Sequence, residues 1–163
     1  MKRPWNIIDS PIYSLQTVDE KGKINMNICT YVTAVSMKPK IYAIAIDYNT
    51  LTYKNVKNSN QFVLQLLSKN QIELVKKFGK KSGYKFNKDK FLRDKKLLIN
   101  WNDFEVLHGT TALIKIDKKN SFASNGDHEL FLFNVVKFKT FSESNILTFQ
   151  DLVGKKLYRR RTL

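Results

Sequence analysis

Residues 25–48 read NMNICTYVTAVSMKPKIYAIAIDY, two strand-like segments joined by a turn that contains Pro39. The stretch is poor in charge, and small or apolar residues occur at both the odd-numbered and the even-numbered positions of its first half. This pattern is typical of a strand covered on both faces rather than one that faces water. Because Ala34 and Ser36 are small, a flat ligand could approach this backbone and take hydrogen bonds from main-chain N–H groups. The plain alternative is a central barrel strand without a ligand.

Length and composition predict a single globular domain over residues 1–163. A chain of 163 residues, 42% of them hydrophobic, is long enough to bury a sizeable core. No run approaches the ~18 apolar residues of a membrane helix, and the N-terminus lacks the apolar segment of a signal peptide. We therefore expect a soluble, cytoplasmic protein that does not bind a membrane. The only cysteine, Cys29, cannot form an internal disulfide.

The formal net charge of +15 comes from 29 Lys and Arg against 14 Asp and Glu. Such a surface attracts anions, and nucleic acid is the first partner to consider. However, the lysines are spread along the chain, and no zinc-finger, helix-turn-helix or RNA-binding aromatic pattern accompanies them. Nucleic acid is therefore an unlikely partner. The diffuse charge would equally suit phosphorylated small molecules such as nucleotides, or reflect only a genome rich in lysine codons.

Hydrophobic periodicity and turn residues predict a mainly β protein with a few helices. The expected strands, besides the one that begins the central stretch, cover residues 12–18, 41–48, 61–67, 104–118 and 130–141. The expected helices are a short one after Asn49, one from Ser68 to Gly79 that begins with a capping box to Gln71, and one near residues 148–153. Residues 80–96 are expected to form a long loop with one helical turn.

Two places outside the central stretch have the chemistry of a binding site. Asn49 or Thr50 can cap the helix that follows, and the unpaired N–H groups of a helix N-terminus suit a phosphate. A plain capped surface helix is the alternative. His128 follows Gly126-Asp127 at the beginning of a strand, so it is better placed to contact a ligand than His108, which we expect in mid-strand.

The common motifs of catalysis by protein side chains are missing. The sequence contains no Gly-rich dinucleotide motif after a strand, no P-loop, no Cys/His cluster for a catalytic metal and no nucleophilic Ser elbow. The chain's own side chains are poorly equipped for covalent chemistry. If the protein is an enzyme, we expect a bound cofactor to carry the reaction.

Four features in order resemble the flavin reductase family, whose fold is the FMN-binding split β-barrel. They are TAVS at Thr33–Ser36 with the Pro39 turn and YAIAIDY, then NTLTYKNV at residues 49–56, the strand-helix unit at residues 62–79, and Gly126-Asp127-His128. The ending LYRRR is similar to the tail of several members. The resemblance spans nearly the whole chain. It departs at Pro39, where the family often has a Pro pair, and at Gln65, where the family has Asn.

The resemblance implies an NAD(P)H:flavin oxidoreductase, with hydride transfer to flavin N5 and reduced flavin supplied to a partner monooxygenase. It also implies a homodimer that binds FMN, with FAD as the other candidate, near its interface. His128 is the candidate catalytic residue, and no metal is expected. The candidate flavin-binding residues are Thr30, Thr33, Ala34, Val35, Ser36 and Gln65 on the ring side and Asn49, Thr50, Thr52 and Asn55 on the phosphate side.

Two other functions remain open from the sequence. One is an FMN-binding electron carrier or flavin store of the same fold without fast reductase turnover, because no separate nicotinamide motif is present. The other is a basic nucleic-acid-binding module. The choices between FMN and FAD and between NADH and NADPH also remain open. We further expect the homodimer to cover apolar strand surface that includes Phe131 and Phe133.

Overall fold

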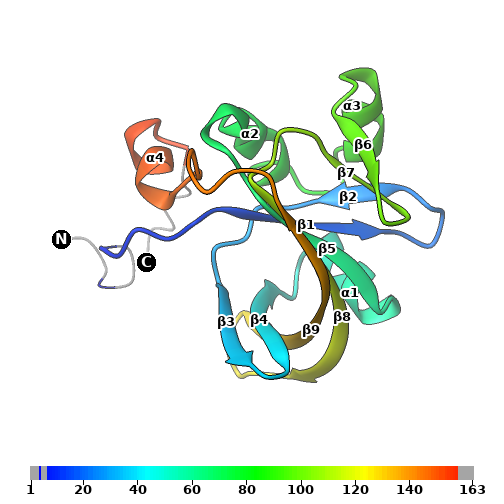
Figure 1. Cartoon of the computed structure of the whole chain (residues 1–163). Helices are drawn as coiled ribbons and strands as arrows, with labels where there is room; N and C mark the ends of the chain where they lie inside the picture. Colours follow the sequence, from blue (N-terminus) through cyan, green and yellow to red (C-terminus); the bar gives the residue numbers. More distant parts are fainter. Residues whose placement is uncertain (1–3, 5–6, 158–163) are drawn as a thin grey trace.

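The computed structural model of the chain describes residue 4 and residues 7–157. The strands are β1 Tyr13–Val18, β2 Ile24–Met26, β3 Val32–Met37, β4 Lys40–Asp47, β5 Gln61–Leu66, β6 Leu98–Trp101, β7 Phe104–Leu107, β8 Ala112–Phe122 and β9 His128–Thr140. The helices are α1 Leu51–Asn58, the 3-10 turn η2 Lys69–Gln71, α2 Leu74–Phe78, α3 Lys88–Asp94 and α4 Phe149–Gly154. The mainly β fold with a few peripheral helices is confirmed (Figure 1).

Seven strands form one antiparallel sheet in the order β2-β1-β5-β8-β9-β4-β3, and β6 and β7 form a separate hairpin. The sheet curls so that β3, β4, β8 and β9 lie around a common interior (Figure 1). Strand pairing leaves β2 and β3 at the two edges. Main-chain hydrogen bonds of 2.9 and 3.0 Å between Tyr13 and Cys29 tie β1 to the segment just before β3, so the two sides of the sheet meet there without a continuous ladder.

The main core lies inside this curled sheet, and a second core lies between its β1–β2 end and helices α2, α3 and α4. Phe131 and Phe133 are fully buried in the first core, and the Phe133 ring packs edge-on against Phe62 at 5.8 Å. The expectation that these two phenylalanines lie on a surface left for a partner was therefore wrong. They share one parity of β9, and that parity faces the interior.

The central stretch forms a strand, but not one covered on both faces. β3 begins only at Val32, and Thr33, Ala34 and Val35 are exposed. The expectation of a doubly covered strand was wrong because β3 is the last strand of the sheet and pairs only with β4. Its low charge and small residues therefore mark an accessible edge.

Three other segments differ from expectation. The strand expected over residues 104–118 is interrupted at residues 108–111, where Gly109 adopts a φ of +76°, so His108 lies in a turn and not in mid-strand. The capping box of Ser68 and Gln71 is present, but it begins the turn η2, and the helix resumes as the short α2. The expected helical turn near residues 89–92 extends to the full α3, capped by Asn87. The basic tail beyond residue 157 lies outside the described residues.

Candidate functional site

Helix α1 begins beside the end of β4, and Thr50 is its N-cap. The Thr50 hydroxyl accepts a hydrogen bond from the Tyr53 N–H at 3.1 Å and donates to the Asp47 carbonyl at 2.8 Å. The Asn49 N–H donates to the Asp47 carboxylate at 2.9 Å. No hydrogen bond in the described part of the chain takes up the N–H groups of Leu51 and Thr52. These two donors at the positive end of the helix can therefore receive an anion.

The side chains of Thr52 and Asn55 face the interior instead. Both residues are almost fully buried. The Asn25 amide donates to the Thr52 hydroxyl at 3.0 Å, and the Asn55 amide donates to the Thr17 hydroxyl at 3.0 Å. At this end of α1, Asn49 and Thr50 therefore lie towards the surface. Of Thr52, only the main-chain N–H is available to a ligand.

Gln65 lies apart from the other candidates. It is fully buried in β5, which three strands separate from β3. Its Oε1 accepts a hydrogen bond from the Leu107 N–H at 2.7 Å, and its Nε2 lies 3.6 Å from the Met26 sulfur. These contacts fasten the end of β7 to the sheet, so the present role of the Gln65 side chain is a structural one.

The other ring-side candidates lie on β3 or, in the case of Thr30, just before it. Thr30 and Ser36 are half-buried, and Thr33, Ala34 and Val35 are exposed. An edge strand directs alternate N–H and C=O groups away from the sheet, and no other strand in the described residues pairs with this edge. A planar heterocycle with donors and acceptors on its rim fits such an edge. The main-chain groups on this edge of β3 are therefore available to a ligand.

His128 lies on the outer face of the sheet next to the start of α1. It pairs with Asp47 across β4 and β9, and its Nδ1 lies 2.5 Å from the Asp127 carboxylate. The Tyr31 ring packs edge-on against the His128 ring at 5.3 Å. The register aligns Thr33 of β3, through Ala43 of β4, with Leu132 of β9. Leu132 lies four residues after His128, so His128 is about 13 Å along the strand from the level of Thr33. His128 therefore belongs to the end of the site near α1.

Tyr31 is a candidate that sequence reasoning missed. It is 56% exposed, and it shares the outer face with Thr33, because the intervening Val32 packs against the core. On β4, the same face carries the small residues Ala43 and Ala45. The alternation of Tyr31 with Thr33 was the signal in the sequence that could have identified it.

Glu129 is a buried carboxylate that ties α1 to β9 directly after His128. It accepts hydrogen bonds from the Tyr53 hydroxyl at 2.8 Å and the Lys57 ammonium at 3.1 Å. The hydrogen bond from the Ser121 side chain, followed by those from Tyr53 and Lys57, lowers the pKa of Glu129, although burial acts in the opposite direction. The same contact with Glu129 raises the pKa of Tyr53.

We predict a pH-dependent loss of stability in Glu129→Gln. Because the folded-state pKa lies below the ordinary Glu value of about 4.3, the ionised carboxylate stabilises the fold above that value and loses this contribution as the pH falls through the folded-state pKa. The variant should be less stable than the wild type near pH 7, and the difference should shrink in acid. Urea unfolding followed by tryptophan fluorescence at a series of pH values measures this.

The matched control is Glu143→Gln, because Glu143 is exposed and forms no ion pair with another described residue. It should change the stability little at any pH. A destabilisation by Glu129→Gln that stays constant from neutral to acid pH would contradict an ionised Glu129.

Comparison with known proteins identifies the family. The model of the flavin reductase like domain matches residues 6–155. The chain belongs to this family of flavin oxidoreductases. The resemblance stated from the motifs is therefore confirmed, and so is the class of enzyme.

Individual relatives are distant. The chain is 23% identical over 138 residues to a flavin reductase from Pseudomonas putida, covering 85% of this chain and 77% of the relative. The NADH:FAD oxidoreductase of Streptomyces globisporus superposes with a TM-score of 0.76 at 15% identity, over 90% of this chain and 84% of the other. The styrene monooxygenase flavin reductase of Pseudomonas putida superposes with a TM-score of 0.75 at 17% identity, over 88% of each chain. At these identities the structural matches establish the split-barrel fold alone.

Proposed function

We propose that this family member uses NADH or NADPH to reduce FMN or FAD, with hydride transfer to flavin N5. The observation that carries the proposal is the unpaired edge of β3 together with the open N-terminus of α1, which begins beside the end of β4 where His128 pairs with Asp47. A bound flavin supplies the hydride-accepting ring, and the chain supplies binding and orientation. The proposed ring contacts are the main-chain groups around Thr33–Ser36.

The phosphate end of the flavin is proposed to meet α1. The N–H groups of Leu51 and Thr52 would donate to the phosphate, and Asn49 and the Thr50 hydroxyl would lie beside it. Lys54 is a weak source of the required positive charge because it lies 3.5 Å from Glu20. The net charge of +15 supports attraction of a dianionic phosphate to the protein as a whole.

His128 is proposed to order the nicotinamide or to shield the reacting face of the flavin. Its contact with the Asp127 carboxylate holds the imidazole in one orientation, and Tyr31 packs against the ring. Glu129 fixes Tyr53 and Lys57 of α1 to β9, so it keeps the helix N-terminus and His128 in a constant relative position. Reaction geometry is sensitive to such positioning.

Flavin-dependent oxidation of NADH or NADPH tests the proposed function. The purified protein, mixed with FMN or FAD and a nicotinamide dinucleotide, should oxidise the nicotinamide over many turnovers, as followed by the loss of its near-ultraviolet absorbance. The alternative is an electron carrier or flavin store, which would show a bound-flavin visible spectrum without such turnover. A protein that binds neither flavin would refute both functions.

His128→Ala and Thr50→Ala should separate the reaction from phosphate binding. We expect His128→Ala to lower the turnover with NAD(P)H while the dissociation constant of FMN changes by less than a few-fold. Thr50→Ala should weaken FMN several-fold and leave riboflavin nearly unchanged, because loss of the N-cap costs about 1 kcal/mol and loosens the first turn of α1, whose Leu51 and Thr52 N–H groups would donate to the phosphate. Calorimetric titration of both ligands and steady-state kinetics measure these effects. Equal losses for FMN and riboflavin in Thr50→Ala would place the phosphate elsewhere.

A homodimer is proposed from the apolar surface around β3. Val35 and Met37 are 52% and 75% exposed, and Phe138 of β9 is 58% exposed. Phe138 and Met37 line one cleft of about 300 Å³, so these two residues belong to one apolar surface. Light scattering at micromolar concentration should give twice the chain mass, and Met37→Lys should shift it towards the monomer. A monomeric wild type that still binds flavin would refute the dimer.

A partner monooxygenase is proposed as the acceptor of the reduced flavin. The support is that one relative of the same fold is the flavin reductase of a styrene monooxygenase.

No helix in the described part of the chain is long and apolar enough to cross a membrane. The single domain over residues 1–163 and the cytoplasmic location stay predictions.

A further inference from the structure

Residues 76–96 carry more than half of the net charge of the chain. This segment holds nine Lys and one Arg against two Asp, a formal net charge of +8 out of +15. It comprises the second half of α2, the joining loop and α3, and these elements lie at the end of the fold away from β3 and β4 (Figure 1). A surface with one sign of charge concentrates counter-ions, so this end of the molecule is the one that attracts a polyanion.

The two acidic residues of the segment are already paired within it. Asp94 lies 3.1 Å from the Lys90 ammonium, and Asp89 lies 3.1 Å from the Arg93 guanidinium. Arg93 also pairs with Glu105 of β7 at 2.7 Å. The only arginine of the segment is therefore occupied, and its planar fork is not available to a further carboxylate. The remaining cations are lysines, which bind phosphate as point charges.

Three lysines without an acidic partner alternate with two phenylalanine rings. The Lys81 ammonium lies 4.8 Å from the centre of the Phe86 ring, and the Lys77 ammonium lies 5.9 Å from the same centre. Lys77 is also 5.5 Å from the centre of the Phe91 ring, and Lys95 follows Phe91 by one turn of α3. None of the three lysines forms an ion pair with another described residue. We call these five residues the lysine–phenylalanine track.

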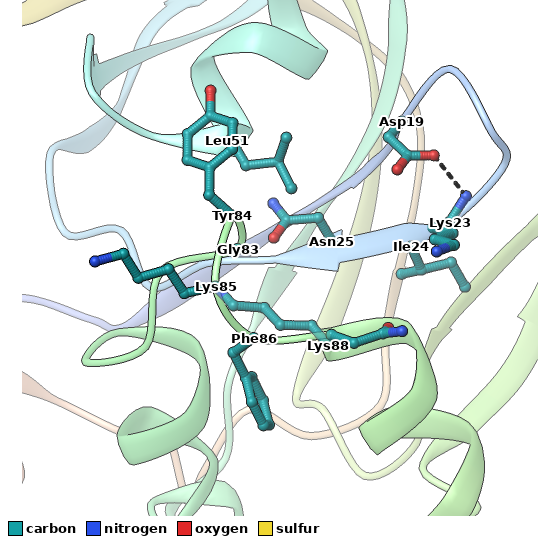
Figure 2. Close-up of a pocket in the computed structure, with 11 residues that line it drawn as sticks. Asp19, Lys23, Ile24, Asn25, Leu51, Gly83, Tyr84, Lys85, Phe86 and Lys88 are labelled. Carbon is teal, nitrogen blue, oxygen red and sulfur yellow. Dashed lines mark hydrogen bonds between the residues drawn. The ribbon is translucent and has the colours of Figure 1, made fainter.

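The loop separates this track from the start of α1. Tyr84 and Phe86 project to opposite sides of the loop (Figure 2). Gly83 packs on α1, because a Cβ at Gly83 would lie 2.9 Å from a methyl carbon of Leu51. Phe86 instead packs against Phe91 of α3, with ring centres 5.8 Å apart. A ligand on the track would therefore not occupy the position proposed for the flavin phosphate.

The composition of the track is suited to a chain of phosphates that carries flat rings. The ammonium groups of Lys77 and Lys81 share one ring and repel each other, and an anion bound between them offsets this repulsion. When an ammonium group moves from a ring to a phosphate, the ring face that it covered becomes open to a base. Phe86 and Phe91 are half-buried beneath lysines, so they are not positioned to insert into a bilayer.

We propose that the lysine–phenylalanine track binds single-stranded nucleic acid. The phosphates would lie at the three lysines, and bases would stack on Phe86 and Phe91. The sequence lacks the common nucleic-acid recognition motifs, but such contacts need none, because phosphates and base faces carry no sequence information. Binding is therefore independent of base sequence and weakens with salt. The proposal does not depend on the flavin chemistry proposed at β3 and α1.

Fluorescence anisotropy of a labelled oligo(dT) strand of about 20 nucleotides tests the proposal. The logarithm of the wild-type affinity should fall with the logarithm of the salt concentration with a slope of about −2, as three phosphate contacts to a single strand predict. Lys77→Gln with Lys81→Gln should reduce the slope to about −0.7 and weaken binding more than ten-fold at about 0.1 M salt.

The matched control is Lys137→Gln with Lys139→Gln, which removes the same charge from β9. Both lysines are exposed, and neither forms an ion pair with another described residue. This double variant should retain the wild-type slope. Phe86→Leu keeps an apolar side chain but removes the ring. It should weaken oligo(dT) several-fold at an unchanged slope and leave the binding of inorganic polyphosphate, which has no bases, unaltered.

Four results would overturn the proposal while the proposed function stands. One is no binding of oligo(dT) by the wild type at low salt. Another is an equal loss in the two double variants, which would leave only the overall charge as the cause. The third is binding of polyglutamate or of phosphatidylserine vesicles at least as tight as that of oligo(dT), which would assign the surface to an acidic protein or a membrane. The fourth is displacement of oligo(dT) by excess FMN, which would place the track in the flavin site.

Discussion

The pairing of β4 with β9 is the constraint on which the site depends. Seven residue pairs, from Ile41 with Asn134 to Asp47 with His128, hold the two strands in one register. Because side chains alternate between faces, this register buries Phe131 and Phe133 and places His128 on the opposite face beside Tyr31. A slip by one residue would exchange the two sets, so core packing strongly determines where His128 lies.

Glu129 shows how the core and the site share one strand. As the neighbour of His128 it points to the other side of β9, where Tyr53 and Lys57 of α1 satisfy its carboxylate. A buried carboxylate is costly unless it is hydrogen-bonded and paired, and this one has both kinds of partner. The contact selects one position of α1 against β9. The open N–H groups at the helix start therefore keep a constant position relative to His128.

A cluster of buried polar side chains lies beneath the same helix. Thr17, Asn25, Thr52 and Asn55 hydrogen-bond one another between β1, β2 and α1. Buried amides and hydroxyls stabilise a fold when they are paired, and they allow few alternative arrangements. This network explains why the residues NTLTYKN combine a capped helix start with polar residues on the inner face. In this segment the buried polar side chains stabilise the fold, and the main-chain N–H groups at the start of α1 remain available to a ligand.

The sequence by itself determined the strand expected over residues 41–48, a cap at Asn49 or Thr50, the capping box of Ser68 with Gln71, the helix near residues 148–153 and the family, because these depend on local hydrogen bonds, periodicity and motif order. It did not determine which faces are covered. The alternation of residue types along β3 is compatible with a central or an edge strand. Thr33–Val35 are exposed because β3 is the last strand in the sheet order. The inward direction of Thr52 and Gln65 and the packing of Tyr31 on His128 likewise depend on partners distant in the chain. Local patterns do not encode those partners, since long-range packing decides which polar side chain finds a protein partner and which remains available for a ligand.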